Sequence, residues 1–466
     1  MTAATATVRL CRLTHASVHR RVSLSQNSSK KRLTSRKKIE AIAQQVLEAS
    51  VADETELVWF ERRRRASAED SPEPEAPQIT ILLRVVDGKR IGWHRTESLD
   101  PNRLESGIRH ALAVSRIQPR VKRRPVMPKQ ENLAPCAVDL FDPAVADLHP
   151  AAARKLLAQT CEGTSARLAW SETRVAVFNS HGLRRHAHTT EVDLEVACGA
   201  GPGAGRSASS ARHLSDLAPE KVATRARELR GEGALGSIPE GPVPVVLSPE
   251  AATELLNVLN FFAFSSHSFF DGTSFLSKHR NVQVFDRIFN LQDDGTAHPG
   301  LPFPFDLEGS SKTPFDLIVD GQPSSPALDR DQGAQAGLRS TAQAAGGGES
   351  FYGNLFLRPG EAEDEDLLAA ADGGLYIGWL DPPECFDPSH LNLRSVARGV
   401  RLVQNGRLGA PLPDLVWEES LLRALARLRA IGQRSVVRIR PSTPLGALSA
   451  PAVVLMESEG FQESRR

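Results

Sequence analysis

The stretch between residues 289 and 354 constrains this chain most, because acidic pairs and glycines alternate there with short apolar runs. That composition is typical of strands joined by tight turns, where glycine adopts backbone angles that other residues avoid. Residues 315–319 form a β-type run, and Asp320-Gly321 follows at once, a dipeptide that favours a two-residue hairpin turn. The stretch therefore predicts short strands and hairpins.

Acidic residues in this stretch stand beside glycines, where both carboxylate and backbone can face a groove. Asp293, Asp294, Asp306 and Glu308 could bind a divalent cation through their carboxylate oxygens, but their spacing is not that of a known calcium loop. Turn formation at exposed rims explains them better than a metal does. We take the following as a candidate peptide groove: Asp294, Gly295, Asp306, Glu308, Gly309 and Asn354.

The length of 466 residues exceeds the size at which one hydrophobic core keeps growing, so two domains are expected. We predict an α+β fold with an N-terminal α/β-type domain with hairpins over residues 36–235. A C-terminal β-rich domain with a central buried helix is expected over residues 242–466. Glycine and proline between residues 233 and 242 mark the boundary.

Charge is unevenly distributed along the chain. Residues 1–39 carry ten Lys and Arg residues and no acid. Removing those ten from the 57 basic residues leaves 47 against 56 acidic residues, a net charge of −9 for the remainder. A body with that charge has no general attraction for phosphate backbones, so we expect no nucleic-acid partner.

Residues 1–35 form a basic arm for which three interpretations stand. An arm without stable structure, or a start codon assigned too early, is the simplest. An organellar presequence is the second, because such segments are rich in Arg and Ser and poor in acids. A nucleic-acid-binding tail is the weakest, because no aromatic residues are interleaved with the charges.

The cysteines point to a reducing compartment. All five are far apart and no CxxC pair occurs, which argues against a disulfide framework. No apolar run approaches the roughly 18 residues needed to cross a membrane, and no secretory signal core is present. We expect a cytoplasmic protein without a membrane partner.

The N-terminal domain is expected to alternate helices and hairpins. Apolar spacing predicts helices at 36–50 and 101–117, and strands at 56–60, 79–86 and 90–95. The Glu- and Pro-rich residues 67–77 are expected to form a loop, and Asp87-Gly88 a turn between the last two strands. The four arginines at 62–65 are expected to form a solvated end. Further strands are expected at 174–178 and 183–197, joined by a turn at 179–182, and a helix at 219–231 closes the domain.

A helix over residues 248–264 is expected to be central in the second domain. Ser248 is a suitable N-cap, and Pro249 occupies the first helical position, where its missing N–H costs nothing. The helix is apolar most of the way round, which indicates burial. Further helices are expected at 363–371 and 418–431, and a terminal strand at 452–457.

The order of short motifs in this half resembles a known family. It runs DDG at 293–295, FDLEG at 305–309, LIVDG at 317–321, glycines at 346–348, and Asn354 before LRPG at 357–360. This order resembles that of the C-terminal half of the TldD/PmbA (TldD/TldE) metalloprotease family, and the resemblance of the chain to the family covers roughly residues 36–460. The likeness is strongest after Gly241.

The resemblance implies a zinc site that this chain lacks. In catalytic members an HExxxH motif in the helix after the strand and cap, with a late cysteine, holds zinc that activates water. Aligned without gaps, the two histidines become Asn257 and Phe262, and the glutamate becomes Val258. No cysteine follows Cys385. The chain thus looks like the zinc-less TldE/PmbA-type subunit, with no cofactor of its own and zinc expected in its partner.

That likeness implies a non-catalytic subunit of a metallopeptidase complex that degrades or trims peptides. Its expected partners are a TldD-like zinc-bearing subunit and an extended or unfolded peptide. Two alternatives stay open: a stand-alone peptide-binding protein without a catalytic partner, and a peptidase whose metal site has moved.

Other motifs are weaker indications of a functional site. His181, His186 and His188 could mimic a metal cluster, but no third ligand on the face shared by the last two is apparent, so we expect surface histidines. The GAGPGAG run at 199–205 does not fit a phosphate-binding loop and is expected to be a surface loop. A serine hydrolase is disfavoured because GxSxG is absent.

Overall fold

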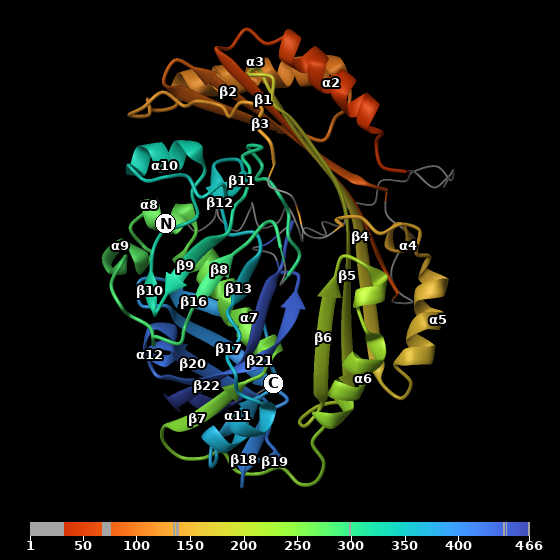
Figure 1. The fold of residues 1–466 in the computed structure, drawn as a ribbon, viewed down its shortest axis with the longest axis vertical. Helices are drawn as coiled ribbons and strands as arrows, with labels where there is room; N and C mark the ends of the chain where they lie inside the picture. The colour runs from red at the N-terminus through yellow and green to blue at the C-terminus, as the bar shows by residue number, and fades with distance from the viewer. Residues whose placement is uncertain are drawn as a thin grey trace.

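A computed structural model describes residues 32–67, 76–133, 136, 139–297, 300–440, 443 and 445–464. The described part contains helices and four β-sheets, which confirms the α+β class (Figure 1). The basic segment 1–31 and most of the predicted loop at 67–77 lie outside the described residues. Packing begins before the predicted start at Arg36, because Leu33 is buried and the Thr34 N–H donates to Glu61.

A six-stranded antiparallel sheet forms the N-terminal part, in the order β3-β2-β1-β4-β5-β6. The predicted turn at Asp87-Gly88 joins β2 to β3, and Gly88 has the positive φ of +60° that such turns require. The strands are β1 (Glu54–Ala66), β2 (Gln78–Asp87), β3 (Arg90–Thr96), β4 (Ser165–Asn179), β5 (Arg184–Cys198) and β6 (Gly205–Ala211).

Helices cover one face of this sheet. At the upper end in Figure 1, α2 (Arg36–Glu48) and α3 (Pro101–Ile117) pack on β1–β3. The helix α3 lies so close that a Cβ on Gly92 would stand 1.9 Å from the Ala111 carbonyl oxygen. At the lower end, α4 (Pro143–Ala146), α5 (Pro150–Thr160) and α6 (Pro219–Glu228) cover β4–β6, with the one-turn η1 (Leu214–Asp216) leading into α6.

The other face of the sheet meets the C-terminal part. Val58 and Val177 from the sheet pack against Phe303 and Phe305 from the long segment of the second half. This contact is apolar at its centre. Charged clusters, described below, lie on the same face.

A ten-stranded mixed sheet organises the C-terminal part, and α7 (Pro249–Val258) packs against its strands β21 and β22. The order is β10-β9-β8-β13-β22-β7-β14-β18-β19, with β21 paired to β22; β13 runs parallel to β22, and β7 to β14. The strands are β7 (Val243–Leu247), β8 (Leu291–Asp293), β9 (Phe315–Val319), β10 (Gln322–Pro323), β13 (Leu355–Leu357), β14 (Leu375–Ile377), β18 (Arg401–Gln404), β19 (Arg407–Pro411), β21 (Leu428–Arg438) and β22 (Leu448–Ser458).

Smaller elements complete this part. A second sheet contains β15 (Trp379–Leu380), β17 (Asn392–Arg398), β20 (Leu415–Ser420) and β23 (Phe461–Glu463), with β16 (Glu384–Asp387) on β17; β11 (Ala344–Gly346) pairs with β12 (Glu349–Ser350). The short helices are α8 (Ser266–Phe270), α9 (Leu276–His279), α10 (Arg330–Ala336), α11 (Asp364–Ala370) and α12 (Leu421–Ala426).

Two sequence predictions fail here. The arginines at 62–65 are not a solvated end, because β1 continues to Ala66 and Arg62 is buried beside Glu191. The predicted helix at 418–431 is instead the end of β20, the short α12 and the start of β21. From Leu428 on, the chain pairs with β22 instead of continuing a helix, and Leu428 and Ile431 are buried. The predicted loop at 199–205 is confirmed up to Ala204, and β6 begins at Gly205.

Candidate functional site

The helix α7 carries the positions at which the family resemblance places a metal motif. Its predicted cap is present: the Ser248 hydroxyl accepts from the Ala251 N–H at 3.0 Å and donates to the Gly378 carbonyl at 2.8 Å. The helix continues into a π turn, η2 (Leu259–Ala263), in which the Phe264 N–H bonds to the Leu259 carbonyl five residues back. Such π turns are rare in proteins, and those that occur are frequently at functional sites. Wider turns of this kind bring residues five apart toward one side of the helix.

The side chains at those positions are unsuited to zinc chemistry. Val258 is buried in the main core, where it has neither a proton to transfer nor a lone pair. Phe262 is half-buried and stacks edge-on with Phe261, which in turn stacks on Phe351 at 5.4 Å between ring centroids. Asn257 is half-buried and carries an amide in place of an imidazole. Within the described ranges no group of three His, Cys, Asp or Glu side chains could hold a metal ion.

Asn260, one turn after Asn257, ties this helix to the glycine-rich segment. Its amide nitrogen donates to the Tyr352 carbonyl at 2.9 Å, and its amide oxygen accepts from the Tyr352 N–H at 3.0 Å. Asn260 is fully buried, so both bonds form in a region without competing water. The π turn and the 352–354 backbone therefore form one rigid unit.

The first part of the predicted groove comes together next to that unit. The Asn354 N–H donates to Asp293 at 2.7 Å, and its side-chain amide donates to the Asp294 carbonyl at 2.7 Å. Gly295 lies close by, where a Cβ would stand 2.6 Å from the Phe303 carbonyl oxygen. The packing there requires glycine.

The second part of the predicted groove, Asp306, Glu308 and Gly309, lies on a loop that contacts the N-terminal sheet. Gly309 has a φ of +79°, and a Cβ there would stand 2.4 Å from the Leu183 side chain. Asp306 is buried and holds its own loop together, accepting from the N–H groups of Glu308, Ser310 and Ala344 at 2.9–3.1 Å. The expectation that these carboxylates line exposed rims is wrong. Their role in peptide binding stays a prediction.

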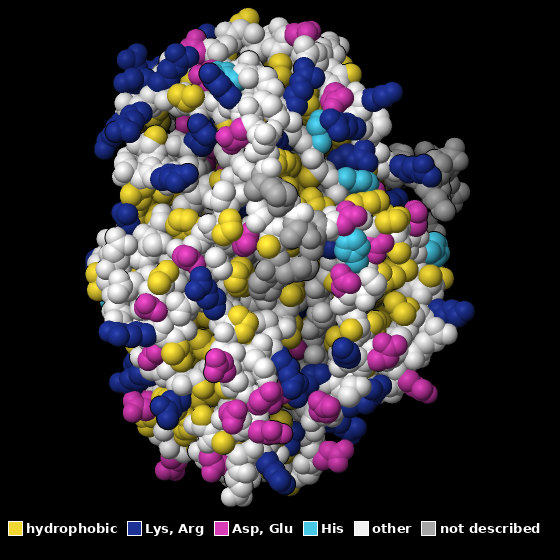
Figure 2. Space-filling model, in the orientation of Figure 1, with side chains coloured by type: hydrophobic (Ala, Val, Ile, Leu, Met, Phe, Trp, Pro, Cys, Tyr) yellow, Lys and Arg dark blue, Asp and Glu magenta, His cyan; other side chains and the backbone are white. Residues whose placement is uncertain are grey.

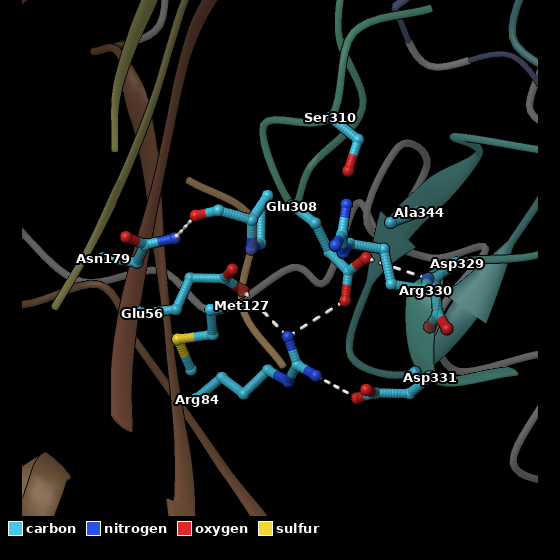
Figure 3. A network of polar contacts seen from close by, with 12 residues as sticks. Glu56, Arg84, Met127, Asn179, Glu308, Ser310, Asp329, Arg330, Asp331 and Ala344 are labelled. Carbon is cyan, nitrogen blue, oxygen red and sulfur yellow. Dashed lines mark hydrogen bonds and ion pairs between the residues drawn. The ribbon is translucent and has the colours of Figure 1, made fainter. Parts of the chain in front are cut away.

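Glu308 leads to a buried polar cluster shown in Figure 3. Arg84 on β2 donates through Nη1 to Glu308 Oε1 at 2.9 Å and through Nη2 to Asp331. Its Nη1 also lies 3.7 Å from Glu56 Oε1 on β1. The second Glu308 oxygen accepts from the Arg330 N–H at 3.1 Å. We call the following residues the Arg84 cluster: Glu56, Arg84, Asp306, Glu308, Asp329 and Asp331.

Burial and mutual repulsion shift the protonation of this cluster. Burial, reinforced by the charge of Glu308, raises the pKa of Glu56 to about 8, that of Asp329 to about 8 and that of Asp306 to about 7. Burial likewise raises the pKa of Asp331 to about 6, although its arginine partner opposes the shift. The cluster therefore takes up protons near neutral pH.

Comparison with known proteins identifies the family. The model of the PmbA/TldA metallopeptidase C-terminal domain matches residues 240–458. Residues 240–458 therefore belong to the PmbA/TldA metallopeptidase C-terminal domain family. No curated protein sequence matches the chain.

Solved structures share the fold of this chain. TldE from Thermococcus kodakarensis superposes with a TM-score of 0.74 at 16% identity, covering 90% of this chain and 99% of its own. A putative modulator of DNA gyrase from Thermotoga maritima gives 0.74 at 19% identity, covering 91% and 100%. A putative modulator of DNA gyrase from Bacteroides thetaiotaomicron gives 0.68 at 16% identity, covering 91% and 99%. The match extends over both halves.

The three histidines that could mimic a metal cluster each have a separate partner. His181 lies 3.5 Å from Glu54, His186 lies 3.1 Å from Glu40, and His188 lies 2.9 Å from Glu172. Burial lowers the pKa of His186, which also packs edge-on against Phe178. His186 and His188 are partly buried, so the expectation of surface histidines was too simple.

Sequence reasoning missed Glu56, Arg84, Asp329 and Asp331. A signal was present: Glu56 and Arg84 interrupt apolar β-type runs, and in a strand a charge at an inward position needs a buried partner. The sequence does not show which residue is the buried partner of each charge. Arg84 and Asp331 stand 247 positions apart.

Surface charge on this chain is not uniform. Figure 2 shows Lys and Arg side chains gathered at the upper end, over β2, β3 and α3, and acidic side chains more frequent at the lower end. Residues 89–129 contain eleven basic and three acidic residues, despite the acidic balance of the body. Among the described residues, no helix is both long and apolar enough to cross a membrane.

Proposed function

We propose that this chain is the non-catalytic subunit of a TldD/TldE-type metallopeptidase complex that degrades or trims peptides in the cytoplasm. The observation that carries the proposal is the set of side chains at Asn257, Val258 and Phe262. The helix, its cap and its π turn are all present, while these three positions offer no metal ligand of the expected kind and no general base. A zinc-bearing partner would supply the metal.

The partner's zinc chemistry requires an extended peptide, and this chain would help to hold it. Extended peptides often bind by adding a strand to a sheet edge, where main-chain hydrogen bonds tolerate many sequences. The strand orders leave β3, β6, β10 and β19 at sheet ends among the described strands. Asp294, Gly295 and Asn354 remain our candidates for peptide contact. Asp306, Glu308 and Gly309 would act by positioning their loop.

A cleavage assay with three arms tests the proposal. The arms are this chain alone, an HExxxH-containing TldD-like subunit alone, and both together, each with an unstructured peptide. Activity is expected only in the mixture. Equal activity of the partner with and without this chain would refute a shared role, and cleavage by this chain alone would refute a non-catalytic one.

Metal content tests the alternative with a relocated site. After mild chelation, elemental analysis is expected to find no stoichiometric zinc in the purified chain. About one zinc per chain would contradict the proposal, and replacing His186, His188 and His267 in turn would then locate the ion. Copurification from the native host separates the remaining alternative: peptide binding without any metallopeptidase partner would favour a stand-alone binding protein.

A further inference from the structure

The Arg84 cluster joins the N-terminal sheet to the C-terminal part. Glu56 and Arg84 come from β1 and β2, whereas Asp306 and Glu308 come from the loop before β9. Asp329 and Asp331 belong to the cap and first turn of α10. All six residues are buried.

Carboxyl groups greatly outnumber cations at this contact. The cluster contains five carboxyls and one guanidinium, and the carboxyls of Glu56, Glu308 and Asp331 lie within 4 Å of that guanidinium. The guanidinium also lies 5.5 Å from the centre of the Trp93 ring on β3. The other charged neighbours do not restore the balance. On β1, Glu54 lies 3.6 Å from the exposed Arg124. Lys312 is buried and lowers the pKa of Asp306 only weakly, because burial and Glu308 have larger effects. Arg330 contributes its backbone N–H, and its side chain is exposed.

Glu56 shows the imbalance most clearly. Its side chain is completely buried, yet among the described residues neither of its carboxyl oxygens has a hydrogen-bond partner. Its nearby cation is the Arg84 guanidinium at 3.7 Å, which also pairs with Glu308 and Asp331. An ionised carboxylate in that position would therefore still be very costly, so it requires a proton or a further cation. The described residues offer no group of three ligands for a metal ion. A proton is therefore the species that fits.

We propose that the Arg84 cluster is a proton-dependent contact between the two halves of the molecule, firm when Glu56 and Asp329 are protonated and weakened when they ionise. The contact adjoins the loop that carries Asp306, Glu308 and Gly309. Its state would therefore set how firmly that loop is held against β2 and β5. This role is independent of the proposed function, because it requires neither peptide nor partner.

The direction of the pH effect follows from linkage. The folded-state pKa values of about 8 for Glu56 and Asp329 exceed the ordinary values near 4. Between those limits the folded chain binds more protons than the unfolded chain, so folding stability falls as pH rises. The loss ends above the folded pKa, near pH 9. For each carboxyl concerned, the unfolding equilibrium constant rises about tenfold per pH unit within this window.

The test measures unfolding of the full chain by urea from pH 5.5 to pH 9. Glu56→Gln removes one titrating proton, so the slope of the logarithm of the unfolding constant against pH is expected to fall by about one proton equivalent. Glu365→Gln, an exposed change on α11, is the matched control and is expected to leave the slope unchanged. Equal slopes in the wild-type chain and Glu56→Gln would overturn the proposal.

Asp329→Asn provides a second variant in case Glu56→Gln does not fold. Asn caps helices as well as Asp does, so the bond from the Gln332 N–H (2.7 Å) is retained while the titrating group is lost. A reduced slope is expected again, and an unchanged one would count against the proposal.

Hydrogen exchange locates the effect within the molecule. After correction for the intrinsic pH dependence of exchange, amides in β2 and the 303–312 loop are expected to lose protection from pH 6 to pH 9, while those in α5 keep theirs. A uniform loss would contradict a local contact. Stabilisation by added Mg²⁺ or Ca²⁺ that disappears in Glu56→Gln would instead assign the cluster to a metal.

Discussion

Two arginine clusters hold the same two halves of this molecule together, and they differ in charge balance. The Arg84 cluster sets five carboxyls against one arginine. The second cluster, which we call the Arg438 cluster, is nearly balanced, with two arginines and three carboxyls: Asp193, Glu195, Glu254, Arg438 and Arg440. Arg438 is buried, and Arg440 is partly buried 2.6 Å from Glu254 on α7.

Because of this difference in charge balance, pKa values are shifted in opposite directions: those of Glu56 and Asp329 are raised, whereas that of Glu195 is lowered. Burial opposes ionisation of Glu195, but the charges of Arg438 and Arg440 hold its pKa below the ordinary value. Its contribution to stability is therefore present above that ordinary value and is lost as pH falls. In the Arg84 cluster stability is lost as pH rises. One interface thus combines two contacts whose strengths change with pH in opposite directions, and we expect maximal stability in between, at mildly acidic pH.

Removing Arg438 should produce the largest effect. Arg438→Met removes a buried guanidinium and its pairs with Asp193 and Glu195. Breaking a buried pair costs about 3–5 kcal/mol of unfolding free energy, and because both carboxylates are partly exposed we expect the lower end, about 3 kcal/mol. Urea unfolding at pH 7 measures the loss. Arg427→Met is the control, because Arg427 pairs with Glu457 at an exposed site, where about 1 kcal/mol or less is expected. Similar losses in both variants would show that the Arg438 cluster contributes no more to stability than an exposed ion pair does.

Removing Arg84 should cost less, and the cost should depend on pH. In Arg84→Met the carboxyls can take up protons in place of the lost guanidinium, so we expect roughly 1–3 kcal/mol at pH 6 and more at pH 8. Unfolding curves at both values for Arg84→Met and Arg438→Met compare the clusters directly. The comparison fails if the cost of Arg84→Met does not grow with pH.

Asp306→Asn tests whether loop structure or charge dominates in the Arg84 cluster. Asp306 accepts three backbone N–H groups, and an amide can offer only one accepting atom. We expect a loss of about 1–3 kcal/mol at pH 6, where the charge contributes little. Ser310→Ala is a suitable control, since it keeps the backbone N–H that Asp306 binds. A stabilised Asp306→Asn chain would mean that charge repulsion outweighs the loop bonds.

Glu195→Gln should have the smallest effect. Glu195 lies at the edge of its cluster with a side chain 39% exposed, so screening by water limits its contribution to about 1 kcal/mol or less at pH 7. The loss should vanish as the pH falls below the lowered pKa of Glu195, because the carboxyl is then protonated in both the folded and the unfolded wild-type chain. Acid unfolding of the variant and the wild-type chain measures this, and a loss that persists in acid would place the contribution in packing rather than charge.

Local features of the fold were predictable where neighbouring residues decide them. The Ser248-Pro249 cap and the Asp87-Gly88 turn form as expected, because a side chain within three residues or a glycine angle fixes each. The predictions at 62–65 and 418–431 were wrong because composition alone does not reveal a buried partner. Arg62 is stabilised by Glu191 across the sheet, and residues 428–431 become a strand because β22 supplies their hydrogen bonds.

The candidate site was only half predictable for the same reason. The motif order lies within the family match over residues 240–458, and the role of its carboxylates in peptide binding stays a prediction. It grouped Asp294 with Asp306, whereas the structure gives them different partners: Asn354 bonds to Asp294, and the N–H groups of Glu308, Ser310 and Ala344 bond to Asp306.

The sequence by itself determined the helix that carries Asn257, Val258 and Phe262, and the chemistry that these side chains lack, because residue identity limits what a side chain can bind or transfer. Only the tertiary structure decided which charges are buried together. Glu56, Arg84, Glu308 and Asp331 are far apart along the chain, and the cost of ionising each depends on burial and on neighbours that folding brings close. Protonation is a property of that assembled environment, which is why no stretch of sequence could reveal it.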